Sequence, residues 1–253
     1  MTPIPLDTIV RFCDQQLSPE HFKDYDGAVN GLQVENRRGV SRMVATVDAS
    51  LATVRKAIDA KADLLIVHHG LFWAPTHPWT GRRYELLRCL LDHDLAVYSQ
   101  HLPLDAHPRL GNCAVLARAL GGTKLRPFFH DKGQSIGWQF SARIPRELLH
   151  QRLASILGGS VTLLAGGGVE CRKIGVCTGG AGSQLKLAAA EGVDTFVTGE
   201  GPHWTHALAE ELGINIFYGG HYATETFGVK ALAASLSRKF RVPWSFVDHP
   251  SGL

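Results

Sequence analysis

Histidine and carboxylate side chains recur at three places along the chain, and together these residue types can bind metal ions. Two histidines are adjacent, and each of two later histidines stands four residues before an acid. The six residues are His68, His69, His101, Asp105, His221 and Glu225. Imidazole and carboxylate ligands without thiolate suit zinc, iron, manganese or nickel, and the sequence does not choose among these metals.

Six candidate ligands exceed the three or four protein ligands that one catalytic zinc ion takes, so two divalent ions are the more economical interpretation. His69 and Asp105 could complete one ion, and His68 and His221 the other, with Glu225 as the bridging carboxylate. A hydroxide shared by two such ions is a nucleophile near neutral pH, which points to hydrolysis.

The pair His221 and Glu225 is weak evidence when taken alone, because a glutamate in the first turn of a helix also complements the helix dipole. Residues four apart on a helix share a face, so the same pair can bind a common ion. The whole set favours metal binding, since packing does not require so many imidazoles and acids at one edge of a fold.

The two adjacent histidines follow a short apolar run, residues 64–67. Asp63 precedes this run, and Gly70 follows the histidines. Such a run is typical of a strand buried on both faces, in a parallel sheet with helices on either side. Ligands bind at the carboxyl ends of strands in these sheets, where the histidines stand. Because neighbouring strand residues point to opposite faces, His68 and His69 reach one site only if the chain turns, which Gly70 permits.

A unit of strand, helix and strand occurs twice, because residues 42–70 and 173–201 align without a gap. Each copy continues into a helical segment, a further strand, and then a histidine four residues before an acid. Self-similarity of this kind is visible in a single sequence. We therefore expect an α/β fold of two topologically similar α/β domains from an internal duplication, residues 1–125 and 126–253, with the C-terminal helix packing back on the first.

The same alignment places Glu200 where the first copy has His69. We expect Glu200 to face a metal cleft, where it could orient a ligand imidazole or take a proton from water as a catalytic base. The alternative is a carboxylate that caps the turn before Pro202.

Composition and charge limit the function classes. The chain has 253 residues, of which 45% are hydrophobic, and its net charge of +3 is not gathered into a long basic run. This distribution gives no electrostatic reason to expect nucleic acid as a partner. No stretch has the length of a membrane span and the N-terminus lacks the features of a signal peptide, so we expect a cytoplasmic protein. The five cysteines have no C-x-x-C spacing, which is typical of reduced thiols rather than of a thiolate zinc site.

Five stretches of the sequence resemble the Ngg-interacting-factor-three-like family, whose bacterial members are named GTP cyclohydrolase 1 type 2 homologues. The stretches are residues 30–34 (NGLQV), 68–73 (HHGLFW), 101–105 (HLPLD), 198–200 (TGE) and 220–228 (GHYATETFG). The resemblance implies two interlinked α/β domains with a dinuclear metal centre between them, assembled as a toroidal hexamer. The metal ligands that it implies are His68, His69, Asp105, His221 and Glu225, with His101 as a nearby active-site residue.

The family name implies hydrolysis of GTP, and two aromatic residues bear on the substrate. Phe72 and Trp73 follow the adjacent histidines and could stack on a purine base, although a packed aromatic pair is the plainer explanation. We expect a metal-dependent hydrolase with two divalent ions per subunit, acting on a small nucleotide-like substrate. The alternative is a non-enzymatic metal-binding or scaffold protein, which would bind metal without turning over a substrate.

Overall fold

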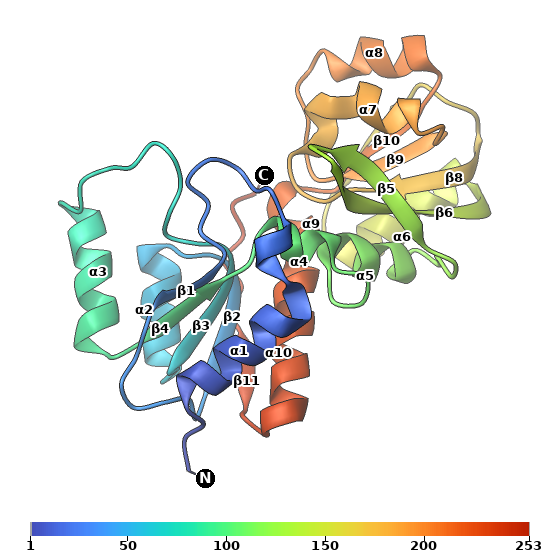
Figure 1. Cartoon of the computed structure of the whole chain (residues 1–253). Helices are drawn as coiled ribbons and strands as arrows, with labels where there is room; N and C mark the ends of the chain where they lie inside the picture. The colour runs from blue at the N-terminus through green and yellow to red at the C-terminus, as the bar shows by residue number, and fades with distance from the viewer. Residues whose placement is uncertain (1, 253) are drawn as a thin grey trace. The chain divides into compact units, whose positions relative to one another are not determined.

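The structure is a computed structural model that describes residues 2–252, and the chain divides into two compact units (Figure 1). The first contains the residues up to Leu104 together with Gly228–His249, and the second contains Asp105–Phe227 with the residues from Pro250 on. This boundary differs from the expected division after residue 125. Helix α5 (Asn112–Ala119) belongs to the second unit, because its buried apolar residues pack into the hydrophobic core of that unit.

The first unit is built on a five-stranded sheet with the order β1-β4-β3-β2-β11. Its strands are β1 (Gly31–Val34), β2 (Met43–Asp48), β3 (Leu64–His69), β4 (Ala96–Ser99) and β11 (Trp244–Phe246). The last four run parallel, and β1 lies antiparallel to β4 at one edge. The expected strand at 64–67 is therefore present, and it extends through both histidines.

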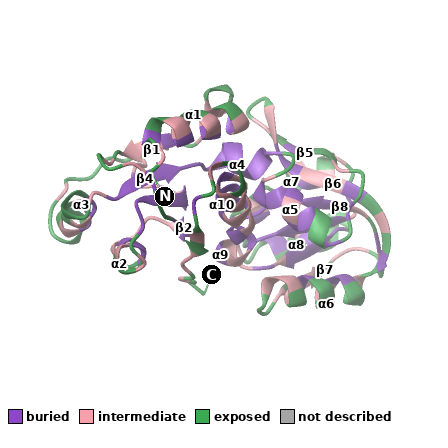
Figure 2. Ribbon diagram, turned by 90° about the horizontal axis from the view of Figure 1, so that it is seen from below, coloured by how far each residue is buried: buried purple, intermediate pink, exposed green. Residues whose placement is uncertain are grey.

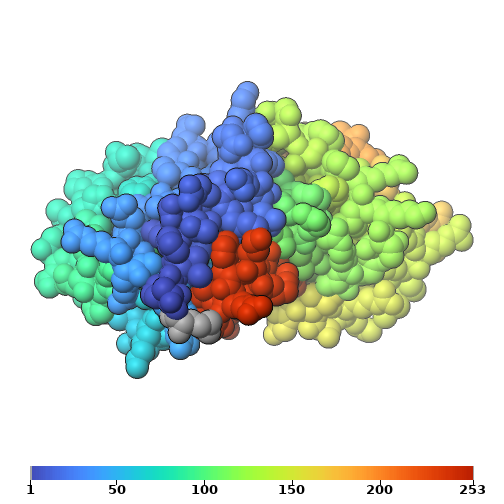
Figure 3. Space-filling model, turned by 60° about the horizontal axis from the view of Figure 1, so that its bottom comes forward, coloured from blue at the N-terminus to red at the C-terminus, as the bar shows by residue number. Residues whose placement is uncertain are grey.

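Helices cover both faces of this sheet, as expected for a sheet whose strands are apolar on both sides. Val97 packs in a cluster with residues of α2 (Leu51–Asp59) and α3 (Arg82–Asp92). The next residue, Tyr98, instead donates a hydrogen bond to Asp14 of α1 (Leu6–Leu17). The ring of Phe12 on α1 lies 5.4 Å from that of Phe240, the last residue of α10 (Thr226–Phe240). Figure 3 shows N-terminal residues, in blue, beside a segment near the C-terminus, in red.

The second unit is built on a six-stranded sheet with the order β5-β6-β8-β9-β10-β7. Its strands are β5 (Arg126–Asp131), β6 (Gln134–Pro145), β7 (Thr162–Ala165), β8 (Glu170–Val176), β9 (Thr195–Thr198) and β10 (Asn215–Tyr218). The strands β8, β9 and β10 run parallel, and each of the other three pairs antiparallel with its neighbour. The remaining helices of the second unit are α6 (Arg146–Leu157), η2 (Ala181–Gln184), α7 (Leu185–Ala190), α8 (Thr205–Leu212) and α9 (His221–Thr224). Outside it, η1 (Pro19–His21) belongs to the first unit, and α4 (Leu102–Ala106) spans the boundary in sequence.

Four strands of each sheet share one topology. The order β1-β4-β3-β2 in the first unit corresponds to β7-β10-β9-β8 in the second, with three parallel strands and an antiparallel strand at the end of each series. This correspondence is what an internal duplication would produce. The second unit adds the hairpin of β5 and β6 beside β8.

Burial follows the sheets (Figure 2). The central strands β2, β3, β4, β9 and β10 are almost wholly buried, and the outward faces of the helices are exposed. All five cysteines are free thiols, and four of them are buried. Among residues 2–252, no helix combines the length and the apolar character needed to cross a bilayer.

Candidate metal centre

Three imidazoles gather at the carboxyl edge of the first sheet. The ring centroids of His68 and His69 lie 4.8 Å apart, and that of His101 lies 4.9 Å from the first and 5.5 Å from the second. One nitrogen from each ring lies within 4.8 Å of the others. His68 and His101 are buried and His69 is half-buried, so the three nitrogens form a partly enclosed set of donors for a cation.

The neighbouring strands determine how the two adjacent histidines converge. His68 donates from Nδ1 to the carbonyl oxygen of Gln100, which follows β4, at 2.9 Å. His69 binds through Nδ1 to the Asp48 carboxylate at the end of β2, at 2.8 Å. Since β3 lies between β2 and β4, each imidazole is held by a different neighbour.

Gly70 follows β3 directly, and the surroundings of its Cα leave no room for a side chain. A Cβ at this position would lie 2.3 Å from Gln33 Nε2 and 2.6 Å from Ser99 Oγ. Gln33 in turn accepts a hydrogen bond from the N–H of Leu71 at 2.7 Å. The turn after the histidines is therefore packed tightly against the edge strand β1 and against β4.

A carboxylate that the sequence did not single out holds the third imidazole. Asp24 Oδ1 lies 2.7 Å from His101 Nδ1, and Asn30 donates to Asp24 Oδ2 at 2.8 Å. The amide oxygen of Asn30 accepts from the backbone N–H of His101 at 2.7 Å. Burial alone would raise the pKa of Asp24, but the hydrogen bonds and positive charge of His101 outweigh it and lower the pKa to about 2.

In the second unit, His221 at the start of α9 lies between two carboxylates. Its Nε2 is 3.2 Å from Glu225 Oε2 and its Nδ1 is 2.8 Å from Glu200 Oε1. The hydrogen bond to Glu225 raises the pKa of His221 to about 9 against the opposing effect of burial, and Glu200 adds to the rise. Glu225 is buried, so positive charge beside it is strongly favoured, which suits a cation.

Asp105, the remaining candidate ligand, is also buried and oriented. One of its oxygens accepts from Asn112 Nδ2 at 2.8 Å and from Thr178 Oγ1 at 3.1 Å. The thiol of Cys113 touches the same threonine at 3.4 Å. A hydrogen bond to Cys113, together with burial, raises the pKa of the Cys177 thiol well above its usual value.

The glycine turn after β8 packs directly against the Glu225 carboxylate and the His221 imidazole. Gly179 has a φ of +68°, and a Cβ there would lie 2.2 Å from Glu225 Oε1 and 3.3 Å from His221 Nε2. Its carbonyl oxygen accepts hydrogen bonds from the N–H groups of Gly199 and Glu200. The backbone thus shapes the surroundings of His221 and Glu225, and only glycine leaves them their present positions.

The four candidate histidines share one arrangement of hydrogen bonds. In each, Nδ1 faces an oxygen acceptor: a carbonyl for His68 and a carboxylate for His69, His101 and His221. A proton on Nδ1 directs the lone pair used for metal binding to Nε2, and such acceptors accompany most metal-ligating histidines. Together with the oriented carboxylates, these imidazoles suit a divalent cation, because they are of the right chemical type and their hydrogen bonds fix their orientation.

The expected substrate residues occupy different surroundings. Trp73 donates from Nε1 to the Gly70 carbonyl at 2.9 Å, and its ring stands edge-on to His101 at 5.1 Å. Phe72 packs on the hydrophobic core of the first unit, with its ring 6.1 Å from that of Trp79. Of these two residues, Trp73 is the one beside the imidazoles, and contact of Phe72 with a substrate stays a prediction.

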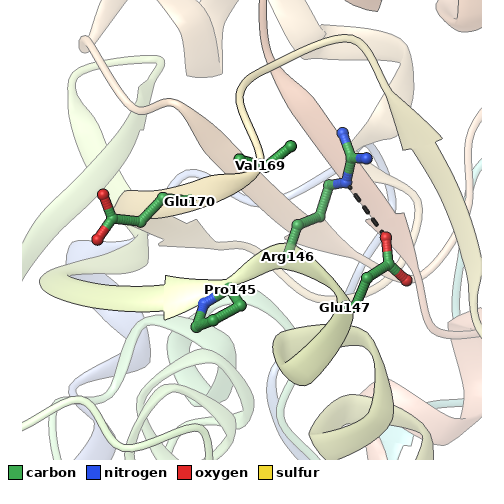
Figure 4. Close-up of a pocket in the computed structure, with 5 residues that line it drawn as sticks. All are labelled: Pro145, Arg146, Glu147, Val169 and Glu170. Atoms are coloured by element: carbon green, nitrogen blue, oxygen red, sulfur yellow. Dashed lines mark ion pairs between the residues drawn. The ribbon is translucent and has the colours of Figure 1, made fainter.

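A pocket of about 470 Å³ lies elsewhere in the second unit (Figure 4). Its lining residues are Pro145, Arg146, Glu147, Val169 and Glu170. It opens at the amino end of β8, whereas Gly179 follows the carboxyl end of the same strand, roughly 20 Å away for a seven-residue strand. None of the candidate ligands lines it, so it is separate from the metal-binding residues.

Comparisons with known proteins identify the family of the chain. The family model Duf34/NIF3 (NGG1p interacting factor 3) matches residues 4–251. A GTP cyclohydrolase 1 type 2 homolog of Deinococcus radiodurans is 41% identical over 98% of this chain and 94% of that protein, and a homolog of the same name from Pseudomonas aeruginosa is 39% identical over 98% of each. The crystal structure of TTHA1606 from Thermus thermophilus is 40% identical, with a TM-score of 0.91 over 99% of this chain and 100% of that one. With a match over nearly all of its length, the chain belongs to the Duf34/NIF3 family.

Proposed function

We propose that this protein binds two divalent metal ions and hydrolyses a small nucleotide-like substrate. The ligands in this proposal are His68, His69, Asp105, His221 and Glu225. The observation that carries it is the shared arrangement of the histidines, each with Nδ1 engaged by an oxygen acceptor. The names of the relatives, GTP cyclohydrolase 1 type 2 homologs, make GTP the first substrate to test.

The bound ions would supply Lewis acidity and would lower the pKa of water toward neutrality. The chain's own groups prepare the site for this chemistry. Glu200 holds the proton of His221 at Nδ1, and Asp48 does the same for His69. Trp73 offers a ring edge beside His101, where a planar base could lie.

Metal content is the first test of the proposal. Protein purified without chelators, stripped and then titrated with Zn²⁺, Mn²⁺, Fe²⁺ or Ni²⁺ should take up two ions per chain. Glu225→Gln removes the charge of the proposed bridging ligand at nearly constant volume, so it should lower the uptake of both ions. Glu210→Gln, an exposed position on α8, is the matched control and should leave uptake unchanged.

Turnover is the second test. GTP and other nucleotides, incubated with the metal-loaded protein, should be hydrolysed by the wild type and not by the Glu225→Gln variant. Two tightly bound ions without turnover of any nucleotide would instead support a non-enzymatic metal-binding role. Light scattering on the same samples tests our further expectation of a homohexamer.

A further inference from the structure

Asp24 is a buried carboxylate that belongs to none of the proposed metal ligands. It lies in the segment between η1 and β1, and its side chain is only 5% exposed. We propose that Asp24, braced by Asn30, is a positioning residue that fixes His101 with its proton on Nδ1, so that Nε2 is offered to a cation beside His68 and His69. This inference rests on the metal binding proposed above.

The contacts around Asp24 form a closed set. Oδ1 binds His101 Nδ1 at 2.7 Å and accepts from the N–H of Tyr25 at 2.7 Å. Oδ2 accepts from Asn30 Nδ2 at 2.8 Å and from the N–H of Leu102 at 3.2 Å. Asn30 completes the set by accepting from the N–H of His101. The imidazole and the backbone of His101 are therefore both tied to the same short segment.

The three imidazoles of the first unit differ in the groups that hold them. His68 faces a neutral carbonyl, and His69 faces the Asp48 carboxylate, whose side chain is 42% exposed. Only His101 faces a carboxylate shielded from water, where a charge-assisted hydrogen bond is strongest.

His101 lies where its orientation can affect metal binding. Its ring lies 4.9 Å from that of His68 and 5.5 Å from that of His69, and the ligand atoms of the three residues lie within 4.8 Å of one another. A neutral imidazole can present either nitrogen, but Asp24 selects the form with Nδ1–H. The acceptors that hold ligand imidazoles typically account for about 10- to 100-fold in metal affinity.

A purely structural role for Asp24 is the alternative, because it also accepts two backbone N–H groups. A double-mutant cycle separates the two roles. Zn²⁺ affinity is measured by competition with a chromophoric chelator for the wild type, Asp24→Asn, His101→Ala and the double variant. Asp26→Asn, an exposed carboxylate two residues further along, is the control.

We expect Asp24→Asn to weaken Zn²⁺ binding roughly 10- to 100-fold in the wild-type background and to change it less than twofold in the His101→Ala background. The Asp26→Asn control should bind like the wild type. Equal losses in both backgrounds, or no loss in either, would overturn the proposal.

A second measurement does not depend on metal. In ¹⁵N-histidine NMR spectra of the metal-free protein, His101 should show a single tautomer with the proton on Nδ1, and Asp24→Asn should give a mixture. An unchanged tautomer in the variant would contradict the positioning role. If the wild type bound no Zn²⁺, the proposed function would fail, and this spectrum would still decide whether Asp24 sets the state of His101.

Discussion

Each of the four candidate imidazoles is oriented by a residue that is not itself a proposed metal ligand. Asp24, Asp48, Gln100 and Glu200 each bind an Nδ1 atom. They come from a loop, a strand end, the residue after a strand and a turn, so no common spacing relates them to their histidines. The effect of a substitution at such a position therefore depends on which imidazole it releases.

Glu200 tests this at the proposed site in the second unit. Glu200→Ala removes the acceptor from His221 Nδ1 and should lower metal affinity by about 10-fold or more, while Glu200→Gln keeps an acceptor oxygen and should lose less. Calorimetric titration with Zn²⁺ measures both. If the alanine variant bound as tightly as the wild type, Glu200 would be no more than a surface carboxylate at that turn.

Gly179 offers a sharper contrast, because the chain contains a matched glycine. Gly179 and Gly158 have φ values of +68° and +70°, so alanine is strained at both by roughly 1 kcal/mol. A Cβ at Gly179 meets Glu225 and His221, whereas one at Gly158 meets nothing within 4 Å.

Thermal unfolding and metal uptake of the two alanine variants separate strain from contact. Gly158→Ala should be modestly less stable with normal metal uptake. Gly179→Ala should be less stable and should also lose metal, because Glu225 is displaced. Similar uptake by the two variants would show that Glu225 tolerates the displacement.

At the scale of elements, the sequence predicted the supports of the site better than its details. The apolar run before His68 and His69 is the central strand β3, and the duplicated pattern matches a series of four strands that has the same order in each sheet. Such features can be predicted from the sequence because they depend on residues that are near one another along the chain. In contrast, the backbone N–H of His101 donates a hydrogen bond to Asn30 across 71 residues of sequence, and spacing carries no signal for such a contact.

The brace between β1 and the turn after β3 gives a prediction at this scale. Gly70→Ala would drive a Cβ into the Gln33 amide and Ser99 Oγ, so either these side chains or the turn that follows His69 must shift. We expect a loss of about 1–3 kcal/mol in unfolding free energy, typical of overpacking, together with weaker metal binding. Chemical denaturation and Zn²⁺ titration measure the two effects.

Gly159→Ala is the control for that substitution, because nothing lies within 4 Å of a Cβ there. It should change neither quantity appreciably. A Gly70→Ala variant with wild-type stability and affinity would mean that Gln33 and Ser99 adjust without moving the histidines.

At the scale of the whole molecule, each unit has a hydrophobic core of its own that contains none of the proposed ligands. The fold should therefore survive removal of metal. Chelation should leave the far-ultraviolet circular dichroism spectrum unchanged and should lower Tm, because an ion bound only by the folded state contributes about 2.7 kcal/mol at roughly 100 times its Kd. Loss of secondary structure on chelation would show instead that the ions are needed for folding.

The first unit is discontinuous in sequence, since Gly228–His249 completes it after the whole of Asp105–Phe227 has been made. Strand β11, which pairs with β2, and most of α10 therefore leave the ribosome after the whole of Asp105–Phe227. The middle of the chain can reach its final form during synthesis, whereas the N-terminal part waits with one sheet edge unpaired. The first unit should accordingly be completed only when Gly228–His249 has been made, and deletions within that segment should harm the N-terminal half first.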